Sequence, residues 1–272
     1  MKKKILIIGK NGFIGNNLFK FLKNKKLNVH SLSFENFLNN YHVFDNKFEF
    51  IINCTSNEKF IKNRYQIKND NDLIIANKII NSKTKLIMLS TRKVYKPKLN
   101  TKELDQKKPN CNYSRNKLVS EISVGKILMH RVLILRISNI IGPPNNNIRK
   151  LHKTFSDIFF EMAKRGYTYN NKKIYKDFIS IKKFNEIILK LIKKNSYGTY
   201  NISIGKKIDI RLIVTWLNFY NSSQLTIISP KNSFNNENFT LNNRKLMHEI
   251  KIKNNLINLK NECLAISRMV FT

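Results

Sequence analysis

The sequence KILIIGKNGFIGNNLFKFLK, residues 4–23, decides the fold of this chain of 272 residues. Residues 4–8 form a short apolar run of strand type, and the pattern from Asn16 to Lys23 is helical. Between these two segments lie three of the eight glycines in the chain, at the spacing G-x-x-G-x-x-G. The stretch therefore predicts a strand, a tight turn and a helix, which together begin an α/β fold.

The three glycines have separate roles in a turn that binds a dinucleotide. Gly9 permits the tight turn, Gly12 lets backbone N–H groups approach a pyrophosphate, and Gly15 lets the helix pack close to the strand. The helix N-terminus adds partial positive charge. A purely structural turn is the alternative, but the placement between strand and helix favours a cofactor site. The expected contacts are Gly9, Lys10, Gly12, Phe13, Ile14 and Gly15.

The residue that ends the second predicted strand, Asn28 to Ser33, bears on the choice of cofactor. A carboxylate at this point would accept the ribose hydroxyls of NAD(H), and here the residue is Ser33. A carboxylate would repel a 2′-phosphate, whereas Ser33 and Lys10 could bind one. The sequence favours NADP(H). Glu35 lies close enough in the chain to keep NAD(H) possible.

Further strand-like runs alternate with helical stretches, which predicts a doubly wound parallel sheet of the Rossmann type. The runs are residues 48–54, 85–90 and 131–137. Thr91 follows one run directly, and Tyr113 and Lys117 lie four residues apart, on one face of a helix. A Lys ammonium beside a phenol lowers the phenol pKa, so the phenol can exchange a proton with a substrate hydroxyl that Thr91 holds. A solvated helix face is the alternative for such a pair.

The composition limits the other classes of function. The net charge of +34 suggests a polyanionic partner, but the basic residues are spread along the chain without a basic helix or arm, so binding of nucleic acid is not expected. No apolar run is long enough to cross a membrane or to form a signal peptide. The three cysteines are widely spaced, so we expect reduced thiols and a cytoplasmic protein; they are Cys54, Cys111 and Cys263. The histidines are scattered without a metal-ligand spacing, so we expect no metal site.

These residues together resemble the extended short-chain dehydrogenases/reductases, the branch that holds nucleotide-sugar epimerases, dehydratases and 4-keto-reductases. The resemblance covers most of the chain. Besides the glycine turn and the Tyr113/Lys117 pair it includes the segments LSTRKVY (89–95), LRISNIIGP (135–143), KDFISI (176–181) and GTYNI (198–202). It implies that Tyr113 is the general acid/base, that Lys117 holds the nicotinamide ribose and tunes Tyr113, and that Thr91 orients the substrate oxygen.

The resemblance implies further contacts and excludes one reaction. The segment Asn53 to Ser56, with Cys54 and Thr55, lies where the loop after the fourth strand of the family contacts the cofactor. Asn69, or Asn71 after a shift of the alignment, would be the supporting amide. In the dehydratases an Asp-Glu pair follows the catalytic Thr, and here these positions are Arg92 and Lys93, which cannot replace carboxyl groups. We therefore do not expect dehydratase chemistry. Lys96 replaces a Gly that is common in the family after Val94 and Tyr95, and this bears on the shape of the loop at that point.

The expected domains are a Rossmann core of residues 1–143 and a small C-terminal substrate-binding lobe of residues 144–272, of which about 174–204 returns to the core. Residues 145–175 lose the alternation of strands and helices and suit a substrate lid. The candidate substrate contacts are Asn139, Arg149 and Lys176; Arg149 and Lys176 could meet a diphosphate. General basicity of the chain is the alternative for both cations. The resemblance also implies a homodimer that pairs through the helix bearing Tyr113.

Three functions follow from these expectations. The first is a reductase in which NADPH reduces a 4-keto sugar on a nucleotide diphosphate and Tyr113 delivers the proton. The second is a nucleotide-sugar 4-epimerase that keeps NAD tightly bound. The third is a sensor or nucleic-acid-binding protein that retains the cofactor site without chemistry, which the intact Thr91, Tyr113 and Lys117 disfavour.

Overall fold

The structure is a computed structural model that describes residues 3–41, 47–144, 153–169, 173–223, 225–228, 238–251 and 255–272. Its α-helices are α1 (Phe13–Asn24), α2 (Phe34–Asn39), α4 (Glu58–Lys62), α5 (Asn71–Lys78), α6 (Asn112–Leu128), α7 (Phe155–Ala163), α8 (Ile181–Lys193), α9 (Ile210–Leu217), α10 (Arg244–Ile250) and α11 (Leu256–Phe271). The short 3₁₀ helices within these ranges are η1 (Ile67–Asn69), η2 (Arg92–Val94) and η3 (Met129–Arg131). The strands are β1 (Lys4–Ile8), β2 (Asn28–Leu32), β3 (Phe50–Asn53), β4 (Lys85–Thr91), β5 (Val132–Ile137), β6 (Asn139–Ile141), β7 (Tyr167–Tyr169), β8 (Tyr175–Lys176), β9 (Phe178–Ser180), β10 (Gly198–Ile202), β11 (Ile208–Asp209) and β12 (Thr226–Ile228).

The central sheet has six strands in the order β10-β5-β4-β3-β1-β2, and every neighbouring pair is parallel. The predicted α/β class with a doubly wound parallel sheet is confirmed. The chain runs from β1 outward to β2 and then returns to β3 on the other side of β1. The strand order therefore reverses between β1 and β3, and a sheet of this kind binds its ligand at the crevice that such a reversal leaves.

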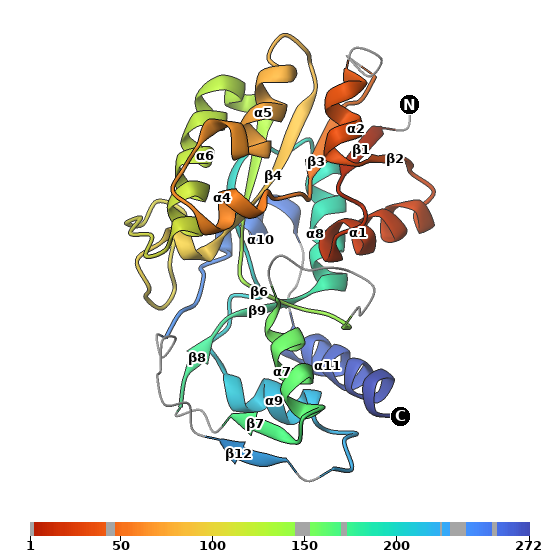
Figure 1. The fold of residues 1–272 in the computed structure, drawn as a ribbon, viewed down its shortest axis with the longest axis vertical. Coiled ribbons are helices and arrows are strands. Elements are labelled where there is room, and N and C mark those ends of the chain that lie inside the picture. Colours follow the sequence, from red (N-terminus) through yellow and green to blue (C-terminus); the bar gives the residue numbers. More distant parts are fainter. Residues whose placement is uncertain are drawn as a thin grey trace.

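Helices cover both faces of this sheet, because its strands are apolar on both sides (Figure 1). One face, with Ile5 and Ile7 of β1, packs against α1 and α8. The other face, with Leu6 and Ile8 of the same strand, packs against α2, α5 and α6. Four residues of β1, Ile5 to Ile8, thus contribute to two cores, while Lys4 is exposed, and this fixes the strand at the centre of the fold.

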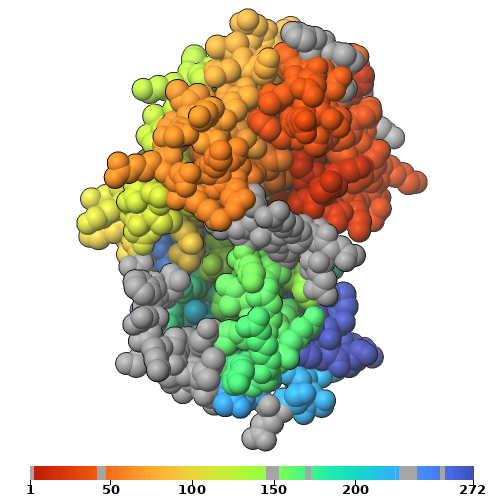
Figure 2. Space-filling view, viewed as in Figure 1, coloured from red at the N-terminus to blue at the C-terminus, as the bar shows by residue number. Residues whose placement is uncertain are grey.

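A smaller lobe lies below the sheet and contains α7, α9, α11, β7 and β12 (Figure 1). In the space-filling view the green and blue lobe lies beneath the red to yellow sheet domain (Figure 2). The chain does not stay in the lobe once it has entered it, because β10 pairs with β5 in the central sheet and α8 packs against α1. The division into residues 1–143 and 144–272 remains a prediction, and these contacts support a return of the later segment to the core.

The segment between residues 145 and 175 contains more regular structure than the sequence analysis expected. Residues 155–163 form α7, and residues 167–169 form β7, which pairs with β12. The helix begins with a capping box: Thr154 Oγ1 accepts a hydrogen bond from the Asp157 N–H at 3.2 Å, and Asp157 accepts one from the Thr154 N–H at 2.8 Å. This Thr-x-x-Asp pattern was the signal that the expectation overlooked.

A buried polar network ties the core strands to α6. Arg136 of β5 forms an ion pair with Glu121 of α6, with a distance of 2.6 Å between Nη2 and Oε2. Ser90 of β4 donates a hydrogen bond to the same carboxylate. Arg136 also donates to the Tyr95 hydroxyl at 2.8 Å, and Tyr95 donates to Asn201 of β10 at 2.7 Å. The network therefore fixes α6 relative to three strands, and it does so next to the predicted site residue that follows Ser90.

Removal of Glu121 should cost far more stability than removal of an exposed acid. In Glu121→Ala the guanidinium of Arg136 stays buried without its counter-charge, so we expect the free energy of unfolding to fall by about 3 to 5 kcal/mol. The control is Glu58→Ala, which breaks the exposed Glu58–Lys62 pair and should cost less than about 1 kcal/mol. Urea titrations of both variants measure the difference. Equal losses in the two variants would contradict this account of the network.

Candidate active site

The glycine turn between β1 and α1 has the geometry that close approach of an anion requires. Gly9 has φ +92°, a left-handed conformation that disfavours any side chain. A Cβ atom at Gly15 would lie 2.9 Å from the Gly9 carbonyl carbon and closer still to its oxygen. Gly12 is the N-cap of α1; within the described residues no side chain caps this end, and the first turn contains no acid. The amides and the positive end of α1 therefore fit a pyrophosphate.

The turn lies at the reversal of the strand order, together with the ends of β2 and β3. The Gly9 N–H donates to the Leu32 carbonyl at 2.9 Å, and the Cys54 N–H donates to the Ile8 carbonyl at 2.9 Å. A Cβ atom at Gly9 would meet Thr55 at 2.5 Å. The structure thus brings Gly9, Cys54 and Thr55 together at one edge of the sheet. The loop after Asn53 follows β3, which pairs directly with β1, and its role as a cofactor contact remains a prediction.

Ser33 and Lys10, which were predicted to receive a 2′-phosphate, have other contacts in this structure. Ser33 is the exposed N-cap of α2, and its hydroxyl accepts a hydrogen bond from the Asn36 N–H at 3.0 Å. The Lys10 ammonium lies 5.6 Å from the centre of the Phe19 ring of α1. The Ser33 hydroxyl can still donate, because a cap uses it as an acceptor only. Both residues stay candidates for the phosphate.

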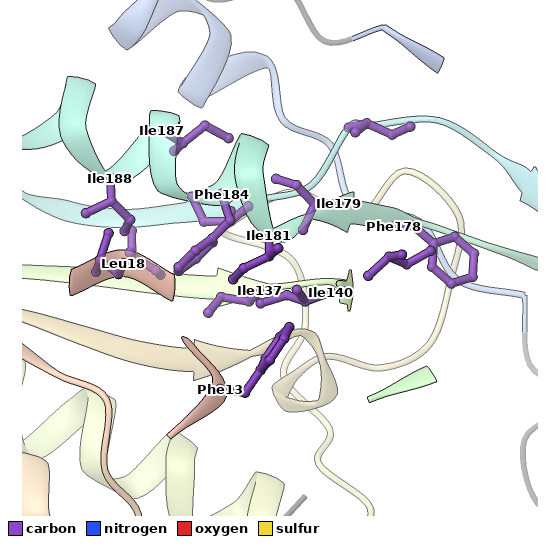
Figure 3. Close-up of a cluster of buried hydrophobic side chains, with 14 of the residues drawn as sticks. Phe13, Leu18, Ile137, Ile140, Phe178, Ile179, Ile181, Phe184, Ile187 and Ile188 are labelled. Carbon is purple, nitrogen blue, oxygen red and sulfur yellow. The ribbon is translucent and has the colours of Figure 1, made fainter. Parts of the chain in front are cut away.

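Phe13 and Ile14 belong to the first turn of α1 and differ in their surroundings. The ring of Phe13 is buried in the core and points toward Ile140 of β6 (Figure 3). It also lies against Gly142, where a Cβ atom would meet the ring. Ile14 is partly buried. A cofactor contact by Phe13 is consequently left to its backbone N–H, which is one of the amides that a helix N-terminus leaves without an intrahelical partner.

The predicted catalytic residues lie on β4 and on the first two turns of α6. Thr91 is the last residue of β4, is 9% exposed, and accepts a hydrogen bond from the Lys93 N–H at 3.2 Å. Tyr113 and Lys117 both lie in α6, which packs against β4 and η2. The helix starts here because Cys111 and Ser114 cap each other, with the Cys111 N–H donating to Ser114 Oγ at 3.2 Å. The three residues therefore lie on adjoining elements.

Lys117 has an acidic partner that the sequence analysis missed. Its ammonium lies 2.8 Å from Oδ2 of Asp72 in α5, and both side chains are buried. The two candidates for a supporting amide bond elsewhere: Asn69 donates to Gln66 at 3.1 Å, and Asn71 donates to Thr55 Oγ1 at 2.8 Å. No single-sequence signal marks Asp72, because the pairing joins two helices through tertiary packing.

The pKa of Tyr113 differs in direction from the sequence expectation. Burial raises the pKa of the Tyr113 phenol; Lys117 lowers it, as predicted, while Asp72 and Cys111 raise it. The predicted effect of Lys117 is therefore present, but burial outweighs it, and the pKa of Tyr113 lies above its ordinary value. Burial by itself would lower the pKa of Lys117, but the Asp72 carboxylate reverses this and holds the pKa above its ordinary value.

Two of the predicted substrate contacts, Asn139 and Lys176, lie on separate short strands. Asn139 of β6 is partly buried and donates to the Asp177 carbonyl at 2.9 Å, which ties β6 to the KDFISI segment. Lys176 lies in β8, partly buried, opposite Ile208 of β11. Arg149 lies outside the described residues. The roles of all three residues remain predictions.

The described residues contain no helix that is both long and apolar enough to span a membrane. In the same ranges, no three side chains of His, Cys, Asp or Glu come together as a group that could hold a metal ion.

The parallel sheet with its strand reversal, the glycine turn and the Tyr113/Lys117 pair define an extended short-chain dehydrogenase/reductase, and the resemblance inferred from the sequence is confirmed. Residues 2–162 match the family described as "RmlD substrate binding domain". Because this match spans more than half of the chain, the protein belongs to that family. No curated protein sequence is significantly similar to the chain.

Solved structures of the same fold match the whole chain at low sequence identity. UDP-N-acetylglucosamine 4-epimerase from Methanobrevibacter ruminantium has a TM-score of 0.82 at 15% identity, with 98% of each chain covered. A dTDP-4-dehydrorhamnose reductase from Clostridium acetobutylicum has a TM-score of 0.78 at 17% identity, and the match covers 99% of this chain and 100% of the reductase chain. RMD from Pseudomonas aeruginosa, solved with NADPH, has a TM-score of 0.79 at 16% identity, and the match covers 99% of this chain and 98% of the RMD chain. At these identities the likeness shows the fold.

The glycine turn makes a direct test of the cofactor site possible. In Gly15→Ala the new methyl group overlaps the Gly9 carbonyl, so the turn must open, and we expect the affinity for NAD(P)H to fall roughly tenfold or more. The control is Gly125→Ala in α6, where a Cβ atom meets no other atom within 4 Å. That variant should bind NAD(P)H normally and gain up to about 1 kcal/mol in stability. Fluorescence titration measures both affinities, and normal binding by Gly15→Ala would contradict the assignment.

Proposed function

We propose that the protein is an NAD(P)-dependent oxidoreductase of nucleotide-activated sugars, and that it reduces a 4-keto sugar with NADPH. The observation that carries the proposal is the position of Tyr113 and Lys117 on one face of α6, packed against β4 at the carboxyl edge of a sheet that holds the glycine turn. When bound, the nicotinamide supplies the hydride. The residues of the chain hold the sugar carbonyl and deliver the proton.

The three residues divide this work by their chemistry. The Thr91 hydroxyl can donate a hydrogen bond to the substrate carbonyl oxygen while it accepts one from the Lys93 N–H. The Tyr113 phenol gives its proton to that oxygen as charge develops on it. Lys117 has three N–H donors, of which Asp72 takes one, so two remain for the nicotinamide ribose.

The substrate class is inferred from the family and from the lobe. The epimerase from M. ruminantium was solved with UDP-N-acetylmuramic acid, which supports a nucleotide-linked sugar as the ligand of this fold. The positive charge of the chain favours the diphosphate of such a ligand, and Lys176 and Arg149 are the candidate contacts. Asn139 would approach the sugar from the start of the lobe.

A 4,6-dehydration is not part of this proposal. Arg92 and Lys93 directly follow Thr91 and form η2, and the Arg92 guanidinium lies 4.7 Å from the centre of the Phe239 ring. Neither side chain can act as the carboxylic acid or the carboxylate base that such an elimination requires.

A 4-epimerase with retained NAD is the second candidate. Glu35 favours it, because this carboxylate lies in the first turn of α2, two residues after Ser33, near the end of β2 where an adenosine ribose binds. For either reaction a homodimer through α6 remains an expectation. It is supported by Val119 and Ile122, two apolar residues of α6 that are 38% and 52% exposed.

The role of Tyr113 is tested by Tyr113→Phe. Loss of the phenol proton should lower turnover of the keto sugar by about a hundredfold to ten-thousandfold and leave the affinity for NADPH unchanged. The matched control is Tyr197→Phe, since Tyr197 is 58% exposed and lies on the surface. Steady-state kinetics with a 4-keto sugar nucleotide and NADPH give the comparison. Near-normal turnover by Tyr113→Phe would refute the proposed mechanism.

The preference for NADPH is tested at Ser33. Ser33→Asp keeps a good N-cap for α2 and adds a carboxylate, so the affinity for NADPH should fall roughly tenfold or more and that for NADH should hold or improve. Ser33→Asn is the control, because it keeps the cap without the charge.

Mass spectrometry of the denatured wild-type protein separates the two candidate reactions. The reductase proposal expects no stoichiometric NAD to be released. Stoichiometric NAD, with equal affinities of Ser33→Asp and wild type for NADPH, would favour the epimerase.

A further inference from the structure

The Lys117–Asp72 pair is a fully assembled buried ion pair between α6 and α5. The two side chains are 4% and 3% exposed, and Nζ lies 2.8 Å from Oδ2. The second oxygen of Asp72 accepts a hydrogen bond from the Asn53 amide at 2.7 Å. Both oxygens of Asp72 therefore face donors, which is the environment of an ionised carboxylate. A buried charge of this kind needs a function or a strong partner to persist, and Lys117 is that partner.

Asn53 extends the pair to the loop that carries Cys54 and Thr55. Its side-chain oxygen accepts hydrogen bonds from the Thr55 N–H at 3.0 Å and from the Thr55 hydroxyl at 2.6 Å. Thr55 lies directly against Gly9 of the glycine turn. A continuous chain of contacts thus runs from the cofactor turn through Asn53 and Asp72 to Lys117, so the position of the ammonium is set from the cofactor side of the site.

The charge of Asp72 also acts on Tyr113. Lys117 of α6, Asp72 of α5 and Cys111 before α6 each act electrostatically on the phenol. Lys117 is cationic and favours the phenolate, whereas Asp72 is anionic and opposes it, as does Cys111 when ionised. The pair as a whole is close to neutral. Lys117 is thereby held in place for the ribose, while Asp72 opposes its effect on the acidity of Tyr113.

We propose that Asp72 is a positioning residue for the reaction, which holds the Lys117 ammonium and compensates its charge so that Tyr113 enters the reaction as a protonated acid. This inference rests on the proposed function, because it says that the same site favours reduction of a keto sugar over oxidation of an alcohol. In reduction, the sugar carbonyl carbon gains a hydride from NADPH and its oxygen gains the Tyr113 proton, leaving an alcohol, NADP⁺ and a phenolate that regains a proton from water. In oxidation of an alcohol the phenolate would have to be present first, and a compensated Lys117 disfavours it.

The direct test is a phenolate titration of the cofactor-free protein, followed by ultraviolet absorbance. The chain contains ten tyrosines, so the signal of Tyr113 is the difference between each protein and its Tyr113→Phe partner. In Asp72→Asn we expect the midpoint of this difference titration to move to lower pH. The control is Asp70→Asn, which changes a neighbouring buried acid that caps α5, and Asn is an equally good cap. It should leave the midpoint unchanged.

An unmoved or raised midpoint in Asp72→Asn would overturn the proposal. If the midpoint is unmoved and the melting temperature falls, the pair is merely structural.

A second pair of variants keeps the test possible if Asp72→Asn does not fold because Lys117 is left unpaired. Lys117→Gln removes the cation and should raise the midpoint of Tyr113. Addition of Asp72→Asn to Lys117→Gln removes the remaining buried charge and should lower the midpoint again. Identical midpoints in the single and the double variant would show that Asp72 does not act on the phenol.

The pH dependence of the reaction, together with the activity of Tyr113→Phe, distinguishes failure of the inference about Asp72 from failure of the proposed function. The rate of keto-sugar reduction should be lost at a lower pH in Asp72→Asn than in the wild type, because the phenol proton is lost earlier. If Tyr113→Phe retains turnover, the proposed function fails whatever the titration gives. If Tyr113→Phe is inactive and the midpoint of Asp72→Asn does not move, the inference about Asp72 fails and the function stands.

Discussion

The contact between α1 and the end of β1 constrains the rest of the structure. At Gly15 the helix backbone lies against the Gly9 carbonyl, with no room for a side chain, and this sets how α1 leaves the sheet. Because α1 is pinned there, its N-terminus points along the edge at which β2 and β3 end. The Cys54–Thr55 loop packs on the same turn. A methyl group added at Gly15 would displace the Gly9 turn, on which the candidate cofactor site depends.

Helix α6 is the second constraint, and it is unusual in carrying its polar residues inward. Lys117, Ser120 and Glu121 are all buried, and they bond to Asp72, Asp70 and Arg136. Burial of two ion pairs on one helix costs desolvation free energy that apolar residues would not incur. In exchange, slippage of the helix along the sheet would leave charges unpaired. The arrangement keeps the start of α6, and Tyr113 with it, in one register relative to β4.

Much of the fold could be predicted from the sequence, since apolar runs and glycine spacing are local signals. The β1 run was predicted residue for residue, whereas α1 was expected from Asn16 and begins at Phe13, because a helix start is masked when its first residues also form the turn. The capping role of Ser33 and the helix that begins after Thr154 were within reach of capping rules. The role of Asp72 could not be predicted, because nothing in one sequence shows that α5 and α6 bring a carboxylate to Lys117. The acidity of Tyr113 could not be predicted either, since it depends on the charge of Asp72.

The pairing of β10 with β5 affects how the chain folds while it is being synthesised. Residues 198–202 complete a sheet whose other strands all end by residue 137, so the first part of the lobe, with α7 and β7, is made before the sheet is complete. Until then, on the ribosome, β5 presents an unpaired row of backbone N–H and C=O groups, the kind of edge on which neighbouring chains aggregate. Such a long-range closure also slows folding, because its loop entropy is lost before the contact is gained. The nascent chain is thus most exposed to misassembly while α7 and β7 emerge, before β10 is made.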